Sequence, residues 1–291
     1  MRCHFRGVLA SSVVLFSLSI YGASPGAMRR PIALDKIDGG DLYVLDAGGI
    51  VFRLREATAG LGVVKSFELP RSQYPTDLTS AKLFGQPTLF VTLNSKLSHI
   101  VAQLSLDGKV EHSWTFTRAL GGLDVDFDSH ILYVASSEKP PEIYQVALQP
   151  SQYSDPKFIG EAVGAGRLGP LVFGAGKRKL YLGDVEAGQI IEFDIATKRS
   201  RVISRGFSSP QALLVSADGG LLYVADSSRA MIYALDLQHP NFPPRPFPKI
   251  GRLRSPSGLA RFDDGRIVVS DDSAARLFVL SKTGTLMSTF P

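Results

Sequence analysis

The chain has 291 residues, of which 44% are hydrophobic and 20% charged, with a formal net charge of +5 and a single cysteine. This composition is that of a folded globular protein, and a chain of this length can bury a sufficient core without disulfides. The modest positive charge does not indicate a dedicated nucleic-acid partner.

Residues 1–27 are expected to be a secretory signal peptide that lies outside the fold. Arg2 and Arg6 form a basic region, an apolar run follows over residues 8–20, and small residues over 23–27 offer the cleavage site. The run is short for a bilayer span, which favours a signal peptide over the alternative of an uncleaved membrane anchor.

The only cysteine, Cys3, belongs to this segment, so the mature chain is expected to contain no disulfide and no cysteine-ligated metal. Removal of Arg2 and Arg6 lowers the formal net charge from +5 to +3. We therefore expect an exported protein of a bacterial periplasm or the cell exterior. We expect no nucleic-acid partner and no membrane span after cleavage.

A short apolar strand recurs along the rest of the chain every 42 to 48 residues. Its six copies are Leu42–Asp46, Leu89–Leu93, Leu132–Ser136, Leu180–Asp184, Leu222–Asp226 and Ile267–Asp271. Further short apolar runs surround each copy, separated by Asp-Gly or Ser/Asp turn signals. Four short strands in a repeat of this length are typical of a propeller blade. The sequence therefore predicts an all-β, six-bladed β-propeller of four-stranded antiparallel blades, with residues 28–291 as one domain.

Three details of this ring stay open from the sequence. The outer strands of the third and fifth units are expected near Phe158–Gly160 and Phe247–Ile250. Pro240–Pro248 is expected to be an extended surface loop, because proline cannot donate to a central strand. Ile32–Asp35 could be the first strand of the first unit or could complete the last one.

Two stretches, Ser209–Asp236 and Ser255–Asp271, resemble the NHL repeat and the related units of SMP-30/gluconolactonase-like propellers. They share an Asp-Gly turn and a Leu-Tyr-Val-x-Asp type of second strand with those families, and the likeness extends over nearly the whole chain after residue 27. Leu89–Asn94 also resembles the YVTN type of repeat. The resemblance implies a propeller, but propellers carry many unrelated functions.

The resemblance to SMP-30-like lactonases directs attention to the mouth of the central channel, where those enzymes hold a divalent cation with Glu, Asn and Asp. The matching positions here are Thr76, Gln211 and Ser257, and the third and fourth units begin with glycines. Asp77 and Asp124 lie one or two residues further along. Because a hard cation needs several converging oxygens, this set favours no metal site, with a Ca²⁺-like cation as the alternative.

A second set of candidates is the residue that ends each recurring strand. Asp46, Asp184, Asp226 and Asp271 occupy this position, with Asn94 and Ser136 in the other units. As ligands they would form a ring of oxygens near the mouth. The structural alternative, that each accepts backbone N–H groups of the following turn, better explains one such residue in most repeats.

The sequence thus favours a non-catalytic scaffold that binds a protein or a small ligand at the channel mouth. The candidate ligand-binding residues are Thr76, Asp77, Asp124, Gln211, Ser257, Asp226 and Asp271. The alternative is a metal-dependent lactonase or related hydrolase with a divergent site.

Overall fold

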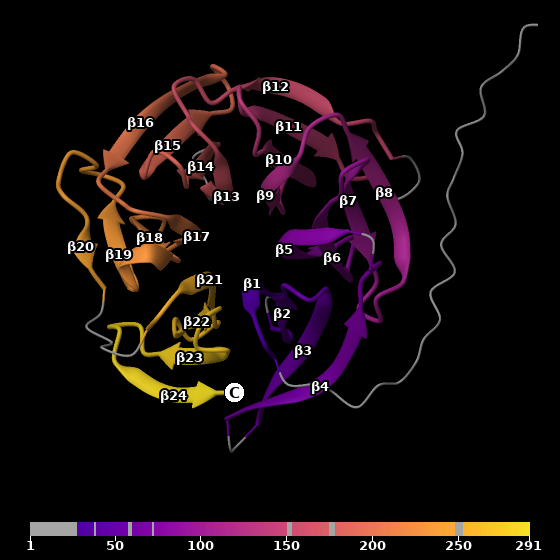
Figure 1. Ribbon diagram of the computed structural model, residues 1–291, viewed down its shortest axis with the longest axis vertical. Coiled ribbons are helices and arrows are strands. Elements are labelled where there is room, and N and C mark those ends of the chain that lie inside the picture. The colour runs from indigo at the N-terminus through magenta and orange to yellow at the C-terminus, as the bar shows by residue number, and fades with distance from the viewer. Residues whose placement is uncertain are drawn as a thin grey trace, which may run out of the picture.

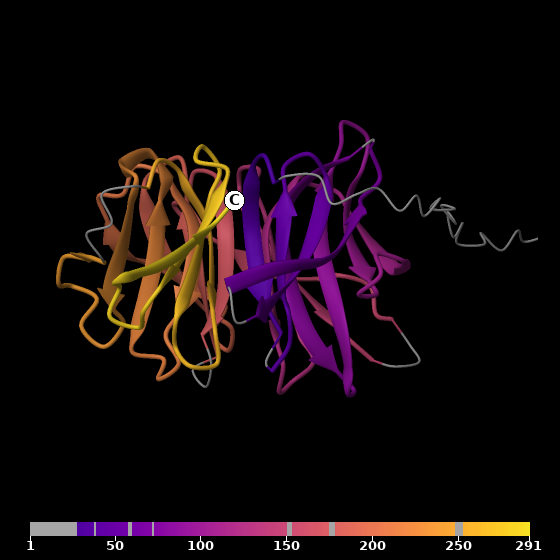
Figure 2. The same ribbon diagram turned by 90° about the horizontal axis from the view of Figure 1, so that it is seen from below.

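A computed structural model describes residues 28–291, except 38, 58–59, 72, 150–152, 175–177 and 248–252. Six four-stranded antiparallel sheets follow one another around a central axis, so the chain forms a six-bladed β-propeller (Figure 1). Seen from the side, the ring is a thick disc whose loops project from its two ends (Figure 2). The expected signal peptide, residues 1–27, lies outside the described residues.

Each blade consists of four consecutive strands, and their order in the sheet goes from the axis to the rim (Figure 1). The first, innermost strands are β1 (Pro31–Lys36), β5 (Tyr74–Leu83), β9 (Leu120–Asp126), β13 (Leu168–Gly174), β17 (Pro210–Val215) and β21 (Pro256–Arg261). The second strands are β2 (Leu42–Asp46), β6 (Gln86–Asn94), β10 (Ile131–Ser136), β14 (Lys179–Asp184), β18 (Leu221–Asp226) and β22 (Ile267–Asp271).

The fourth, outermost strands are more exposed than the third strands beside them. The third strands are β3 (Ile50–Ala57), β7 (His99–Leu104), β11 (Glu142–Ala147), β15 (Gln189–Asp194), β19 (Met231–Asp236) and β23 (Arg276–Leu280). The fourth are β4 (Gly60–Glu68), β8 (Val110–Phe116), β12 (Lys157–Glu161), β16 (Arg199–Arg205), β20 (Arg245–Pro246) and β24 (Leu286–Phe290). Among the described residues, the only helical segment is a single 3₁₀ turn, Ser227–Arg229.

The recurring apolar strand of the sequence is the second strand of each blade. In β2 and β22 all five residues are buried, because each blade is covered on both faces by its neighbours. In the fifth and sixth blades an Asp-Gly turn connects the first and second strands: Gly219 and Gly265 adopt φ of +68° and +87°, which only glycine accepts readily. The turn glycines and the strands buried on both faces together explain why the repeat can be recognised in the sequence.

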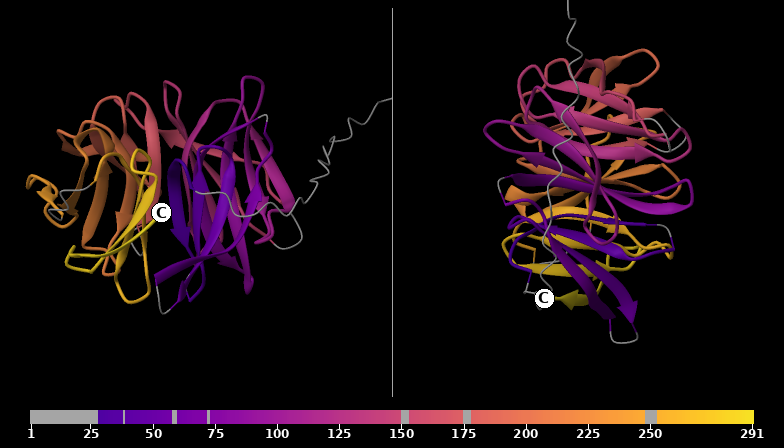
Figure 3. Two further views of the ribbon diagram at one scale, coloured as in Figure 1. Left: turned by 60° about the horizontal axis from the view of Figure 1, so that its bottom comes forward. Right: turned by 90° about the vertical axis from the view of Figure 1, so that its right-hand side faces the viewer.

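The ring closes by packing between the first and last blades. β1 is the first strand of the first blade, which settles the alternative that the sequence left open. Leu34 and Phe52 of the first blade share a buried cluster with Ala260 and Val268 of the last. The two terminal blades consequently lie side by side (Figure 3).

The outer strand of the fifth blade is β20, which directly precedes Phe247 and pairs with Tyr233 and Ala234. It lies inside the segment Pro240–Pro248, which was expected to be entirely loop. A proline at the outermost position is tolerated because its missing N–H faces away from the ladder. The outer strand of the third blade, β12, falls where it was expected. Residues 248–252 lie outside the described part of the chain.

Candidate functional site

The axis opens into a cavity of about 450 Å³ at one end of the ring. This mouth end is where first strands begin and second strands end, as the pairing of Pro31 with Asp46 shows. All six blades contribute to the lining, which includes Arg30, Thr76, Asp77, Asn94, Gly121, Arg167, Pro170, Gln211, Ser227, Ser255, Ser257 and Asp272. It is a mixed surface of backbone, hydroxyl, amide and guanidinium groups, of a size suited to a small ligand or a few residues of peptide.

Thr76, Gln211 and Ser257 occupy equivalent places at this mouth. Each is the extra residue of a β-bulge near the start of its first strand. The Gln211 side chain is exposed and donates from Nε2 to Ser209 Oγ at 2.9 Å, while Thr76 Oγ1 lies 2.7 Å from Thr92 Oγ1. Ser257 is buried and donates to the carbonyl oxygen of Pro31 at 2.6 Å. The structure therefore places two of the three in the open mouth and uses the third to join two blades.

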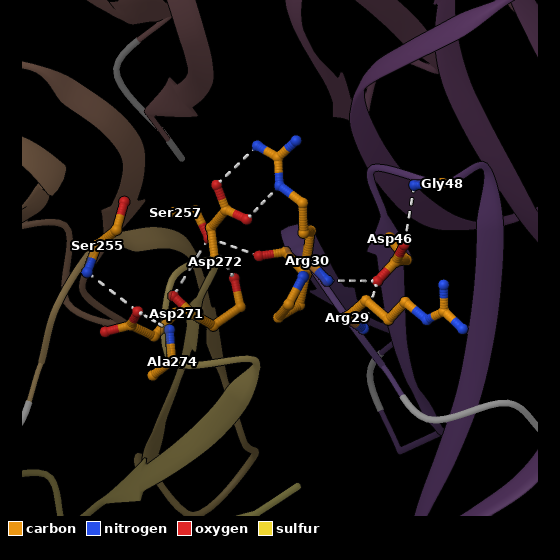
Figure 4. Close-up of polar contacts among 11 residues, drawn as sticks. Arg29, Arg30, Asp46, Gly48, Ser255, Ser257, Asp271, Asp272 and Ala274 are labelled. Atoms are coloured by element: carbon orange, nitrogen blue, oxygen red, sulfur yellow. Dashed lines mark hydrogen bonds and ion pairs between the residues drawn. The ribbon is translucent and has the colours of Figure 1, made fainter.

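The carboxylates that end the second strands are hydrogen-bonded to the backbone. Asp226 accepts the N–H groups of Ser208 and Ser209 at 2.8 and 2.9 Å. Asp271 accepts those of Arg254, Ser255 and Ala274 at 2.6, 3.0 and 2.9 Å. The partners of Asp226 belong to the loop entering its blade. Those of Asp271 belong to the entering loop and to the next turn, as Figure 4 shows for Ser255 and Ala274.

The same arrangement occurs in two further blades. Asp46 accepts from Arg29, Arg30 and Gly48, and Asp184 accepts from four backbone N–H groups and from Gln189 Nε2. Burial opposes ionisation of Asp184, but these bonds outweigh it and lower the pKa of the carboxyl. The expected bonds to the following turn occur at Asp46, Asp184 and Asp271 but not at Asp226. All four carboxylates also accept N–H groups of the loop that enters the blade, a contact that was not expected from the sequence.

Asp77 and Asp124 lie deeper, beside a narrow cavity of about 80 Å³ on the axis. Asp77 accepts the N–H of Leu123 in the next blade at 3.2 Å, and Asp124 accepts that of Phe173 at 2.7 Å. Burial, reinforced by the neighbouring carboxylates, raises the pKa of Asp77 to about 8 and that of Asp124 to about 7. Both residues line the channel, and their carboxylates link neighbouring blades through these hydrogen bonds.

A third channel carboxyl, Asp35, was not recognised from the sequence. It occupies the same register position in β1 as Thr79 in β5 and Asp124 in β9. Thr79 Oγ1 lies 3.1 Å from an oxygen of Asp35 and 3.1 Å from an oxygen of Asp124. An alignment of the six first strands on the turns that follow them would have placed Asp35 beside Asp124 as a channel residue. One half of the channel is thus polar, whereas Val172, Leu214 and Leu259 line the other half.

Two arginines of the mouth were also missed, because the sequence was searched for oxygen ligands. The guanidinium of Arg30 forms a bidentate ion pair with Asp272, at 2.8 and 3.0 Å, across the junction of the first and last blades (Figure 4). Arg167 precedes β13, lines the cavity and is exposed. Its side chain has no ion-pair or hydrogen-bond partner among the described residues. A signal was available, since each lies immediately before a first strand.

The described residues contain no group of three or more His, Cys, Asp or Glu side chains arranged to hold a metal ion. The carboxylate oxygens of Asp77 and Asp124 accept hydrogen bonds from backbone N–H groups of the strands that form the channel wall. Within the same residues, no helix is long and apolar enough to cross a bilayer.

Comparison with known proteins identifies the architecture only. No family model matches the chain. No curated protein matches it either. Among solved structures, a chain in the crystal structure of a nidogen/laminin complex superimposes with a TM-score of 0.67 and 13% identity, covering 84% of this chain and 90% of that chain. At that identity the likeness shows a shared β-propeller fold. The similarity to NHL and SMP-30 units stays a resemblance of short motifs.

Proposed function

We propose that this protein is an exported, non-catalytic binding scaffold whose ligand occupies the mouth cavity. The observation that carries the proposal is the cavity itself, about 450 Å³ in volume and built from all six blades. Among the described residues, Arg167 presents a guanidinium there with no side-chain partner, and the Gln211 side chain is exposed there and bonded only to Ser209. A rigid ring that offers such groups from several loops can bind a ligand without rearranging.

Two further observations support a scaffold. Asp226 and Asp271, which a lactonase with a divergent site could use as metal ligands, are hydrogen-bonded to backbone N–H groups. The propeller of similar fold belongs to a complex of two proteins, nidogen and laminin. That likeness supports protein binding as a use of this fold. The class of partner for the present chain is inferred from the residues of its own mouth cavity.

A selection with displayed peptides tests the proposal. A library of random peptides on phage is panned on the immobilised protein, and each enriched peptide is then titrated by fluorescence anisotropy. We expect enriched peptides to lose at least about tenfold in affinity for Gln211→Trp, because the indole fills the cavity.

The matched control is Gln238→Trp, the same substitution at an exposed turn on the opposite end of the ring. Thermal unfolding of both variants confirms that each is folded. Enriched peptides that bind all three proteins equally would show that the mouth is not the binding site, and the proposal would fail.

A further inference from the structure

The loops of the mouth end carry a marked excess of basic side chains. Their described charged residues are Arg29, Arg30, Arg71, Lys96, Arg118, Lys139, Arg167, Arg229 and Arg254 against Glu138, Glu186 and Asp272. Arg29, Lys96, Arg167 and Arg254 are exposed and have no ion-pair partner among the described residues. The aspartates of this end that would offset them, such as Asp226 and Asp271, are buried beneath the loops and hydrogen-bonded to backbone.

Inside the cavity the charges do not balance either. Asp272 neutralises Arg30 through the bidentate pair. Asp77 is the other carboxyl of the lining, and its pKa of about 8, raised by burial, leaves it protonated at neutral pH. Arg167 therefore remains as an uncompensated positive charge in a concave site. Low-dielectric walls strengthen its attraction for an anion, and its planar fork matches a carboxylate.

Three large hydrophobic side chains, here called the apolar rim, are exposed at the mouth end and lie outside the residues that line the cavity. Leu97, Val163 and Tyr74 are the most exposed large hydrophobic side chains of the described chain, at 97%, 73% and 70%. All three belong to the mouth end. Tyr74 directly precedes Pro75 of the cavity lining and pairs with Asn94, which leads into the turn that carries Leu97. Val163 lies in the loop that leads to Arg167.

We propose that the mouth binds an acidic segment of a partner protein, with a carboxylate against Arg167 and flanking apolar side chains on Leu97, Val163 and Tyr74. This inference rests on the proposed function and adds the chemical class of the ligand. The basic loops supply charge complementarity for the segment, and the apolar rim supplies contacts that a free anion could not use. A protein segment is the occupant that uses both features at once.

The composition of the peptides selected above is the first test. We expect peptides whose binding depends on the mouth to be rich in Asp and Glu, with apolar residues beside them. Replacing their acidic residues by Asn and Gln should weaken binding at least about tenfold, since charge-assisted hydrogen bonds are lost. Mouth-dependent peptides that are neutral or basic would overturn this inference and leave the proposed function standing.

Binding of the acidic peptide to variants of the protein tests which positive charge it contacts. Arg167→Ala should weaken the acidic peptide about tenfold, whereas Arg199→Ala, an exposed arginine at the other end of the ring, should change nothing. Asp272→Asn should tighten binding about two- to fivefold, because it frees Arg30 from its partner. Equal losses for Arg167→Ala and Arg199→Ala would indicate general charge attraction and contradict the site.

Substitutions in the apolar rim distinguish binding of a protein segment from binding of a free anion. Leu97→Ser together with Tyr74→Ser should weaken the acidic peptide several-fold. Inorganic phosphate should compete only weakly, in the high millimolar range, as expected for screening. If phosphate displaced the peptide at low millimolar concentration, and the rim substitutions had no effect, the mouth would be a site for a small oxyanion and the inference would be wrong.

Discussion

The hydroxyl of Ser257 in the last blade donates a hydrogen bond of 2.6 Å to the carbonyl oxygen of Pro31 in the first. No strand is shared between these blades, since each is built from four consecutive strands. The junction depends on side-chain contacts: this bond, the apolar cluster around Leu34 and the ion pairs Arg30–Asp272, Lys36–Asp263 and Glu56–Arg266. Ring closure is therefore sensitive to single substitutions.

Ser257→Ala should destabilise the protein by about 1–3 kcal/mol, because it leaves the buried carbonyl oxygen of Pro31 without its donor. Urea unfolding followed by circular dichroism measures this. Ser288→Ala, at an exposed position of β24, is the control and should stay within about 0.5 kcal/mol of the wild type. Equal stability of both variants would show that the bond contributes nothing to closure.

Asp271→Asn should cost about 1–3 kcal/mol, because an amide nitrogen would face one of the N–H groups that the carboxylate now accepts. Asp155→Asn removes the same charge from an exposed loop and should have little effect. If Asp271→Asn left the unfolding free energy unchanged but abolished ligand binding, this carboxylate would be a ligand contact rather than a loop support.

The channel carboxyls should make stability depend on pH. The folded protein holds protons on Asp77 and Asp124 up to pKa values of about 8 and about 7, whereas unfolded aspartates titrate near pH 4. Their contribution is complete below about pH 4 and is lost as the pH rises to about 8. The hydroxyl of Thr79 can donate to only one of Asp35 and Asp124 at a time, which favours a retained proton in this group.

Asp77→Asn removes one of these titrating groups. We expect its unfolding free energy, relative to that of the wild type, to increase between about pH 4 and about pH 8 and to level off above that. Urea unfolding at a series of pH values measures the difference between the two proteins, in which other titrating groups cancel. A difference independent of pH would contradict the raised pKa of Asp77.

Gly122→Ala should be severely destabilising, by about 3 kcal/mol or more. A Cβ at this position would lie 2.2 Å from the backbone nitrogen of Leu171, so β9 and β13 would have to separate. Gly62→Ala is the control, because its Cβ would meet only the carbonyl oxygen of Arg55 at 4.0 Å. Similar melting temperatures for the two variants would refute this account of the close contact between blades.

Addition of metal ions should not stabilise the protein. A cation at about a hundred times its dissociation constant would add about 2.7 kcal/mol, which raises the melting temperature of such a chain by several degrees. We expect no change when chelated protein is heated with millimolar Ca²⁺, Mg²⁺, Mn²⁺ or Zn²⁺. A clear rise, accompanied by hydrolysis of a lactone, would favour the metal-dependent enzyme over the scaffold.

The sequence by itself determined the all-β architecture and the number of blades. Turn residues such as Gly219 and the apolar second strands act locally, so each repeat records its own strands. The expected Asx-type bond to the following turn needs only neighbouring backbone and is present at Asp46, Asp184 and Asp271, whereas Asp226 bonds only to the loop that enters its blade.

Only the tertiary structure decided which side chains meet. Asp35 and Asp124 lie on either side of Thr79 because the ring brings together equivalent positions of three successive blades. The hydrogen bond of Ser257 depends on the junction of the chain's two ends, and the free charge of Arg167 depends on which neighbours are already paired. Local interactions determine the length of the repeat. The chemistry of the mouth arises from contacts between blades, which no single repeat contains.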